Sequence, residues 1–184
     1  IRRIFTQGWQ TEWQSTMESQ LLNVSPKARM LGVDYGKAPK DYQAGPIHIT
    51  FRYEIPDYAL VGDRELLLKP MVMNNLYTSV LSFLRLCGCI RSLSRFRDAC
   101  SRLVELDETI ALPRGYRLAG EPRSEQKAAP AADFEGSLQQ VGNKLVLKQK
   151  LALKKRIYRA ADWEGFRAAV NAYKSFADYL IVKL

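Results

Sequence analysis

The segment from Ile47 to Ile55 alternates strictly between apolar and polar side chains, and this pattern limits the fold more than any other feature of the sequence. The apolar positions are Ile47, Ile49, Phe51, Tyr53 and Ile55, and the polar positions are His48, Thr50, Arg52 and Glu54. A period of two residues predicts a β-strand. One polar face is typical of an antiparallel sheet that is exposed to water on one side.

The same alternation recurs further along the chain. One such strand is predicted at Leu103–Leu112, which places four aliphatic side chains on one face. A hairpin around Gly142 is predicted from the segments Phe134–Gln140 and Lys144–Leu153. In the second arm we expect the leucines to face inward and Lys148 and Lys150 to face outward. Further extended segments are expected at Ala28–Tyr35, Arg64–Lys69, Tyr116–Ala119 and Tyr179–Leu184, with the tail of a strand at Ile4–Thr6 and a loop at Glu121–Ala132.

Two segments follow a helical period instead. Gln10–Leu22 has large apolar side chains at every fourth position, namely Trp9, Trp13, Met17 and Leu21. Asp162 is expected to cap a second helix near the C-terminus. The apolar stripe of that helix is Trp163, Phe166, Val170, Tyr173 and Ala177. Asn75–Ile90 fits either a helix or two short strands.

About eight strands with short turns and two helices predict a mainly β protein. We expect an antiparallel β-sandwich of the immunoglobulin-like kind, with one or two helices that include a C-terminal helix. With 184 residues, the chain fits a single β-rich module over residues 1–184. The alternative is an internal boundary near residue 94, which separates a helix-plus-β half (1–94) from a β half with the C-terminal helix (95–184).

Charge and hydropathy exclude some classes of protein. The most apolar segment, Tyr77–Ile90, is short and contains Arg85, so we interpret it as buried and not as membrane-spanning. The net charge of +9 includes a basic run at Lys144–Arg159. A nucleic-acid site needs stacking aromatics beside such a run, and only Tyr158 is near. The run is therefore interpreted as the polar face of a strand, with nucleic-acid binding as the less favoured alternative.

The single histidine and the three cysteines raise the question of a nucleophile and its base. His48 lies among polar neighbours on its predicted strand, and Cys87, Cys89 and Cys100 lack the local signatures of cysteine enzymes. Cys-Gly-Cys alone is a weak zinc signal. Either one disulfide to Cys100 or buried free thiols fit the cysteines, and their redox state is not fixed by the sequence.

Carboxylates do not supply an alternative active site. Glu105 and Asp107 share the outward face of one predicted strand, where solvated acids are ordinary. No glycine-rich phosphate loop, zinc helix or serine elbow is present. The sequence therefore predicts no catalytic, cofactor-binding or metal-binding residues, no cofactor and no small-molecule substrate.

Several segments resemble a known family. The first group is Gly45-Pro46-Ile47 leading into FRYEIPDYA, followed by a glycine turn and LLLKP. The second group is TIALPRGYRL, a polar loop, GNKLVLKQKLALKKRIYRAADWEGFRAAVNAY and a final LIVKL. Together they resemble the region after the catalytic core, and the C-terminal non-catalytic domain, of bacterial transglutaminase-like proteins. The resemblance covers most of the chain.

The resemblance implies a parent protein with an N-terminal β domain, a papain-like core carrying Cys, His and Asp, and this C-terminal β module. None of the catalytic residues of that core corresponds to a position in this sequence. The start of the chain, Ile-Arg-Arg, is expected to be that of a fragment or a mature product. The resemblance also implies export, in the bacterial periplasm, envelope or medium.

The functional expectation is a non-catalytic accessory or interaction domain. Its expected partner is a preceding catalytic domain or another protein. An independent envelope adhesion or assembly module is the alternative, and nucleic-acid binding through residues 144–159 is the third reading.

Overall fold

A computed structural model describes residues 2–70, 96–97, 101–176 and 180–184. The chain divides into two compact units, Ile1–Tyr58 and Ala59–Leu184. The boundary considered near residue 94 lies outside the described residues, as does the ambiguous segment Asn75–Ile90. None of the helices in the described ranges is long and apolar enough to cross a bilayer.

The first unit contains two helices and one two-stranded sheet. In chain order its elements are α1 (Arg2–Gln7), α2 (Gln10–Leu22), β1 (Arg29–Asp34) and β2 (Thr50–Glu54). The helix predicted at Gln10–Leu22 is confirmed, and Trp13, Met17 and Leu21 are buried. Trp9 precedes the helix and is 78% exposed, so it does not belong to the buried stripe.

Two expectations for the first unit are wrong in detail. Ile4–Thr6 lies inside α1 and not in a strand, because Phe5 packs edge-on against Trp13 of α2. The strand expected over Ile47–Ile55 begins at Thr50. Thr50 pairs with Asp34, the last residue of β1, so residues 47–49 have no strand opposite them.

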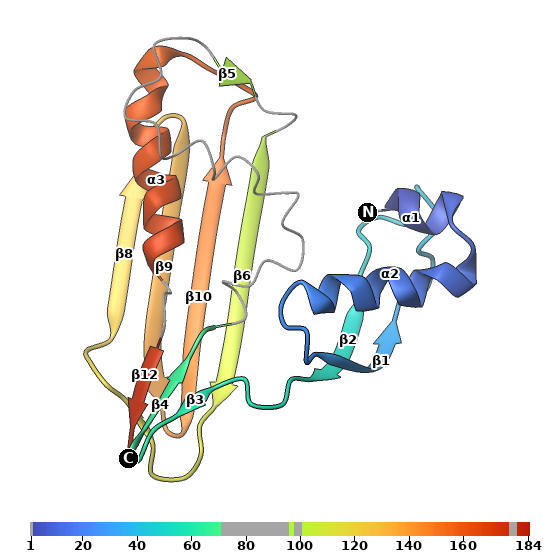
Figure 1. The fold of residues 1–184 in the computed structure, drawn as a ribbon. Coiled ribbons are helices and arrows are strands. Elements are labelled where there is room, and N and C mark those ends of the chain that lie inside the picture. The colour runs from blue at the N-terminus through green and yellow to red at the C-terminus, as the bar shows by residue number, and fades with distance from the viewer. Residues whose placement is uncertain (1, 71–95, 98–100, 177–179) are drawn as a thin grey trace. The chain divides into compact units, whose positions relative to one another are not determined.

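The large sheet of the second unit has the strand order β6-β10-β9-β8 and is antiparallel throughout. Its strands are β6 (Arg102–Ala111), β8 (Arg123–Ala128), β9 (Ala132–Val141) and β10 (Lys144–Leu153). Every residue of β10 has a partner on both β6 and β9, with no shift in register (Figure 1). The hairpin and the third strand predicted from the sequence are therefore confirmed.

The loop expected at Glu121–Ala132 is wrong, because it contains β8. This strand pairs with β9 from Arg123 opposite Leu138 to Ala128 opposite Asp133. Its side chains are nearly all polar and exposed, so they carry no alternation. Strand β8 exists through backbone hydrogen bonds to β9, which the side-chain pattern does not reveal.

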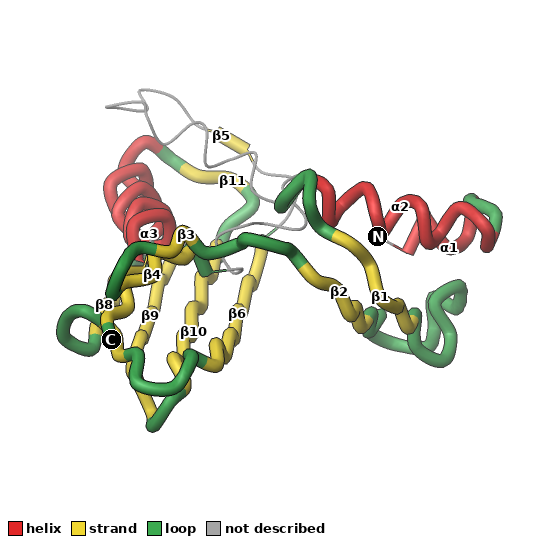
Figure 2. Tube along the Cα trace, turned by 60° about the horizontal axis from the view of Figure 1, so that its bottom comes forward, coloured by secondary structure: helices red, strands yellow, loops and turns green. Residues whose placement is uncertain are grey.

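A second, smaller antiparallel sheet has the order β3-β4-β12-β7. Its strands are β3 (Leu60–Val61), β4 (Glu65–Leu68), β7 (Arg117–Leu118) and β12 (Leu180–Lys183). A short turn, η3 (Ala160–Asp162), leads into helix α3 (Trp163–Phe176), and β5 (Phe96–Arg97) pairs with β11 (Ile157–Tyr158). Helix α3 and the small sheet lie on the same side of the large sheet (Figure 2).

One hydrophobic core joins these layers. Buried side chains from β4, β9, β10, α3 and β12 form a single cluster that includes Leu68, Leu147, Phe166, Tyr173 and Val182. A sandwich-like arrangement results, and the prediction of a mainly β, antiparallel fold with a C-terminal helix is confirmed. Asp162 was expected to cap the helix that follows it. Instead, its carboxylate accepts a hydrogen bond from the backbone N–H of Arg159, three residues earlier, at 2.9 Å.

Candidate functional site

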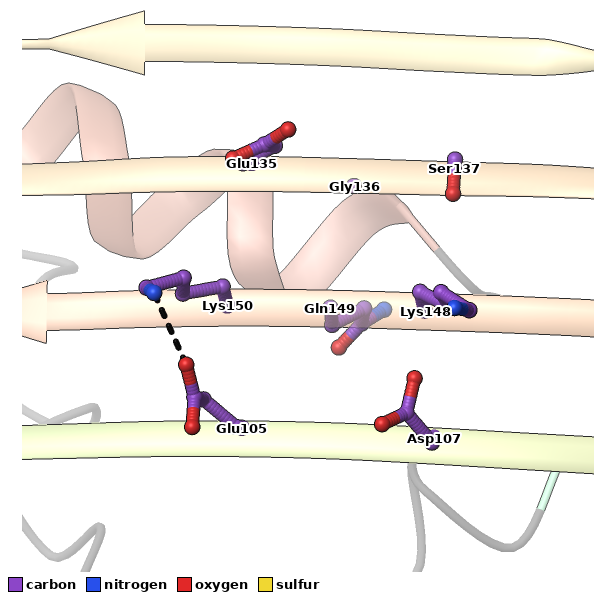
Figure 3. A pocket seen from close by; sticks show the side chains of 8 residues that line it. All are labelled: Glu105, Asp107, Glu135, Gly136, Ser137, Lys148, Gln149 and Lys150. Carbon is purple, nitrogen blue, oxygen red and sulfur yellow. Dashed lines mark ion pairs between the residues drawn. The ribbon is translucent and has the colours of Figure 1, made fainter.

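The outward face of the large sheet carries a group of charged side chains around a hollow. The register places Glu105 of β6 and Glu135 of β9 on either side of Lys150 of β10. In the next outward row Lys148 lies between Asp107 and Ser137. These side chains line a shallow hollow of about 350 Å³, with acids flanking the lysines of the central strand (Figure 3).

One ion pair joins the central strand to β6. Lys150 Nζ lies 2.8 Å from Glu105 Oε1, and both side chains are more than half exposed. The hydrogen bond to Glu105, and then the negative charge of that residue, raise the pKa of Lys150 above its usual value. An exposed pair of this kind contributes little to stability, but it neutralises a lysine that would otherwise add to a positive surface.

Two other lysines of the basic run, Lys154 and Lys155, also contact carboxylates. Lys154 Nζ lies 2.6 Å from Asp133 Oδ2, and Lys155 Nζ lies 2.6 Å from Asp162 Oδ1. Hydrogen bonds from these two lysines are the largest cause of the lowered pKa values of the two aspartates. The prediction that Lys148 and Lys150 face water is confirmed. What the sequence did not show is that carboxylates from other elements contact much of the run.

The carboxylates singled out in the sequence lie where the alternation placed them. Glu105 and Asp107 are exposed on the outward face of β6, whereas Glu108 is half-buried on the other face. Among the described residues no group of three or more His, Cys, Asp or Glu side chains has the geometry to hold a metal ion. The acids on this face therefore meet lysines, and each strand contributes one sign of charge.

His48 lies in the first unit, directly before β2, and its side chain is exposed. Its backbone carbonyl approaches Gly36, where an added Cβ would lie 2.9 Å from the carbonyl oxygen. Cys87, Cys89 and Cys100 lie outside the described residues. The pairing of His48 with a cysteine therefore stays an untested alternative.

A second hollow, of about 480 Å³, lies in the first unit beside Trp13 and the loop after β1. Trp13 packs edge-on against Phe5 and Tyr35, and the Lys40 ammonium lies 5.2 Å from the Trp13 ring centroid, within cation–π range. The Tyr35 hydroxyl is buried without a hydrogen-bond partner in the described chain. Burial, and then the charge of Glu18, raise the pKa of Tyr35.

This aromatic cluster was only partly visible in the sequence. The spacing of Trp13 and Met17 indicated a buried helix face, but Phe5 and Tyr35 come from other elements. Trp13 itself is only 4% exposed, so its ring is a core side chain and offers little surface to a ligand. The hollow is walled mainly by the loop from Gly36 to Asp41.

The match to a family of known proteins lies in the second unit. Residues 99–182 match a family model described as "Domain of Unknown Function with solved-structure structure (DUF3858)". A search of curated protein sequences finds no match to the chain.

One similar solved structure is a crystal structure of a "putative protease" from Parabacteroides distasonis. The two chains share 13% sequence identity and superpose with a TM-score of 0.56, over 67% of this chain and 24% of that chain. At this identity the similarity shows the fold alone. The chain thus corresponds to about a quarter of the length of the longer protein.

Proposed function

We propose that this chain is a non-catalytic accessory module of a bacterial envelope or secreted protein, and that it packs on a transglutaminase-like catalytic core or on a larger assembly. The observation that carries the proposal is that its fold recurs as 24% of a longer chain described as a "putative protease". A domain of that share leaves room in the same chain for a separate catalytic domain. The resemblance of FRYEIPDYA and of the C-terminal motifs to transglutaminase-like proteins supplies the class of core.

The chemistry of the described surface supports an accessory role. The acids on the large sheet face lysines, as in the pair of Glu105 and Lys150, and the shifted pKa values of Asp133 and Asp162 have ion pairs as their largest cause. Structural ion pairs of this kind shift pKa values without catalysis. The raised pKa of Tyr173 follows from burial in the core and not from a cleft.

Nucleic-acid binding through residues 144–159 is disfavoured by the same ion pairs. Lys150, Lys154 and Lys155 each contact a carboxylate within this chain. Neutralised lysines release few counterions from a phosphate backbone, so we expect weak binding of single-stranded DNA even at about 50 mM salt. Tight binding that falls steeply as salt is added would favour the nucleic-acid reading instead.

The direct test is to assay the whole 184-residue chain for amide hydrolysis and for amine-dependent crosslinking of a glutamine-containing protein. The expected result is no turnover above buffer. The matched control replaces Cys87, Cys89 and Cys100 together by alanine. Turnover by the native chain that disappears in this triple variant would sink the proposal, since it would place a cysteine nucleophile in the chain.

A further inference from the structure

Strand β6 is an edge of the large sheet and pairs with β10 alone among the described elements. The pairing runs without a shift over ten residues, from Arg102 opposite Leu153 to Ala111 opposite Lys144. Strand edges in natural proteins are commonly blunted by bulges, prolines or outward lysines, and β6 has none of these. Charged side chains are its protective features: Arg102 and Glu108 lie on the inner face, and Glu105 and Asp107 lie on the outward face.

The alternation of hydrogen bonds between β6 and β10 shows which backbone groups of β6 point away from β10. The backbone N–H of Leu112 donates to the carbonyl of Asn143 at 2.8 Å, and these residues continue the β6–β10 register. Opposed residues of an antiparallel pair alternate between bonded and non-bonded positions. The even-numbered residues of β6 therefore bond to β10. The odd-numbered residues direct their backbone N–H and C=O groups away from β10: Leu103, Glu105, Asp107, Thr109 and Ala111.

The side chains along this edge specify the chemistry of an added strand. On the outward face Glu105 and Asp107 present two carboxylates. On the inner face Val104, Leu106 and Ile110 are only partly buried against the core. A strand laid beside β6 would complete both faces if basic residues met the acids and aliphatic residues covered the three partly buried side chains.

The strand on the other side of β6 already shows this match. Lys150 of β10 lies opposite Glu105 and contacts it at 2.8 Å, and Lys148 lies opposite Asp107. The inner face of β10 carries Leu145, Leu147, Leu151 and Leu153, and the buried Gln149 lies between the two lysines. The free edge presents the same acids and the same aliphatic row to an incoming segment.

A second copy of β6 is disfavoured at this edge in the register that pairs the strand most symmetrically about its acids. In an antiparallel β6–β6 pair centred on Leu106, Glu105 of each strand would lie opposite Asp107 of the other. Like charges placed directly opposite each other destabilise a strand pair. A basic segment avoids this repulsion and is complementary in charge to the two acids.

We propose that the edge of β6 that no described strand covers binds, by strand addition, an extended protein segment in which lysine or arginine alternates with aliphatic residues. Backbone hydrogen bonds to the odd-numbered residues would supply affinity, and Asp107, together with Glu105 that already pairs with Lys150, would select the basic pattern. The proposal rests on the proposed function, because it names the surface and the class of partner through which an accessory module would hold that partner.

The test uses a fluorescently labelled peptide with the β10 pattern, KLVLKQKLAL, titrated with the whole chain. The matched control peptide, ELVLEQELAL, has the same aliphatic residues and the opposite charge. Saturable binding of the lysine peptide alone is expected, together with slowed hydrogen exchange at the amides of Leu103, Glu105, Asp107 and Thr109. Equal binding of both peptides, no binding, or protection elsewhere in the chain would overturn the proposal.

Two charge-reversal variants test whether the peptide binds at the edge of β6 or is attracted by the net charge of the chain. Asp107→Lys should weaken the lysine peptide roughly 3- to 10-fold and improve binding of the glutamate peptide. Glu125→Lys makes the same change of charge on β8, the opposite edge of the sheet, and should leave both affinities unchanged. Equal effects of the two variants would show that net charge, and not the β6 edge, attracts the peptide.

The two proposals fail by different results. Loss of peptide binding overturns the strand-addition site and leaves the accessory role standing. Cysteine-dependent turnover overturns the accessory role and leaves the peptide measurements unaffected.

Discussion

Gly136 lies against the ring of Phe176: a Cβ atom added to Gly136 would lie 3.0 Å from two carbons of that ring and 2.7 Å from the ring of Phe134. Glycine is therefore required on this inner position of β9, where α3 closes on the sheet. Gly136→Val is expected to destabilise the chain by about 1–3 kcal/mol through overpacking. Urea unfolding measures the change, and Ser137→Val on the opposite face, expected to cost far less, is the control.

Leu147 on β10 is fully buried in the core that the large sheet shares with α3 and the small sheet. Leu147→Ala is expected to lower the free energy of unfolding by about 2–5 kcal/mol, because it removes buried methyl groups and leaves a cavity. The neighbouring Val146 lies on the other face and is half-buried. Val146→Ala should cost less than about 1 kcal/mol, and similar costs for both would contradict the assigned facing of β10.

Tyr173 on α3 is 2% exposed, and its hydroxyl has no hydrogen-bond partner in the described chain. Burial raises the pKa of Tyr173 from 10.0 to about 12. Because the folded pKa is higher, the unfolded chain loses this proton first as pH rises. The contribution of the protonated Tyr173 to the free energy of unfolding is fully present below pH 10. It is lost progressively as the pH rises toward 12, by roughly 1–2 kcal/mol.

The Tyr173→Phe variant tests whether the ionisation of Tyr173 causes the loss of stability at alkaline pH. At pH 8 it should be as stable as the native chain or slightly more stable, because it removes an unpaired buried hydroxyl. Between pH 10 and 12 its stability should fall less than that of the native chain. Parallel pH profiles of the two proteins in urea unfolding would rule out Tyr173 as the source of the alkaline loss.

Asp133 on β9 receives a hydrogen bond from Lys154 at its Oδ2 atom and one from the backbone N–H of Ala129 at Oδ1. The hydrogen bond from Lys154 is the largest cause of the lowered pKa of Asp133. Since the folded pKa is lower, the carboxylate contributes stability above pH 3.8, the unperturbed value, and this contribution is lost as pH falls through the folded pKa.

Asp133→Asn should therefore cost less than about 1 kcal/mol at pH 7, since the ion pair is partly exposed. The difference from the native chain should narrow as the pH falls below 3.8. In a double-mutant cycle, Lys154→Met should remove most of the effect of Asp133→Asn. Independent, additive effects of the two substitutions would contradict the contact.

Gly36 and the backbone of His48 lie close together in the first unit, so substitutions at the two positions can be compared. Gly36 has a φ of +73°, and an added Cβ would lie 2.9 Å from the His48 carbonyl oxygen, a backbone atom. Gly36→Ala is expected to destabilise the first unit by about 1–3 kcal/mol. His48→Ala leaves that carbonyl in place and removes only an exposed ring, so its effect should stay within about 0.5 kcal/mol. Thermal unfolding followed by tryptophan fluorescence compares the two.

The long elements of the fold were predictable, because each carries its own side-chain period. Helix α2 and strand β10 have the bounds that the sequence indicated, and β6 and β9 differ by one or two residues. Strand β8 was missed because its side chains are nearly all polar, and α1 was missed because a helix of six residues is too short to show a period.

The candidate surface was predictable for each strand separately, but not as a surface shared by several strands. Alternation placed Lys148 and Lys150 in water, and it placed Glu105 and Asp107 on the outward face of another strand. It did not show that these strands are neighbours, because Glu105 and Lys150 are far apart in the sequence. The ion pair, and the neutral character of the face, depend on that pairing.

The sequence by itself determined which segments are strands and helices with a buried face, and which lysines and acids meet water, because side-chain period is a local property of the chain. Only the tertiary structure decided the order β6-β10-β9-β8, the existence of β8, and which strands lie at the edges of the sheet among the described strands. The physical reason is that strands pair through backbone N–H and C=O groups. These groups are nearly the same at every residue, so the amino-acid pattern of a strand does not determine which strand pairs with it.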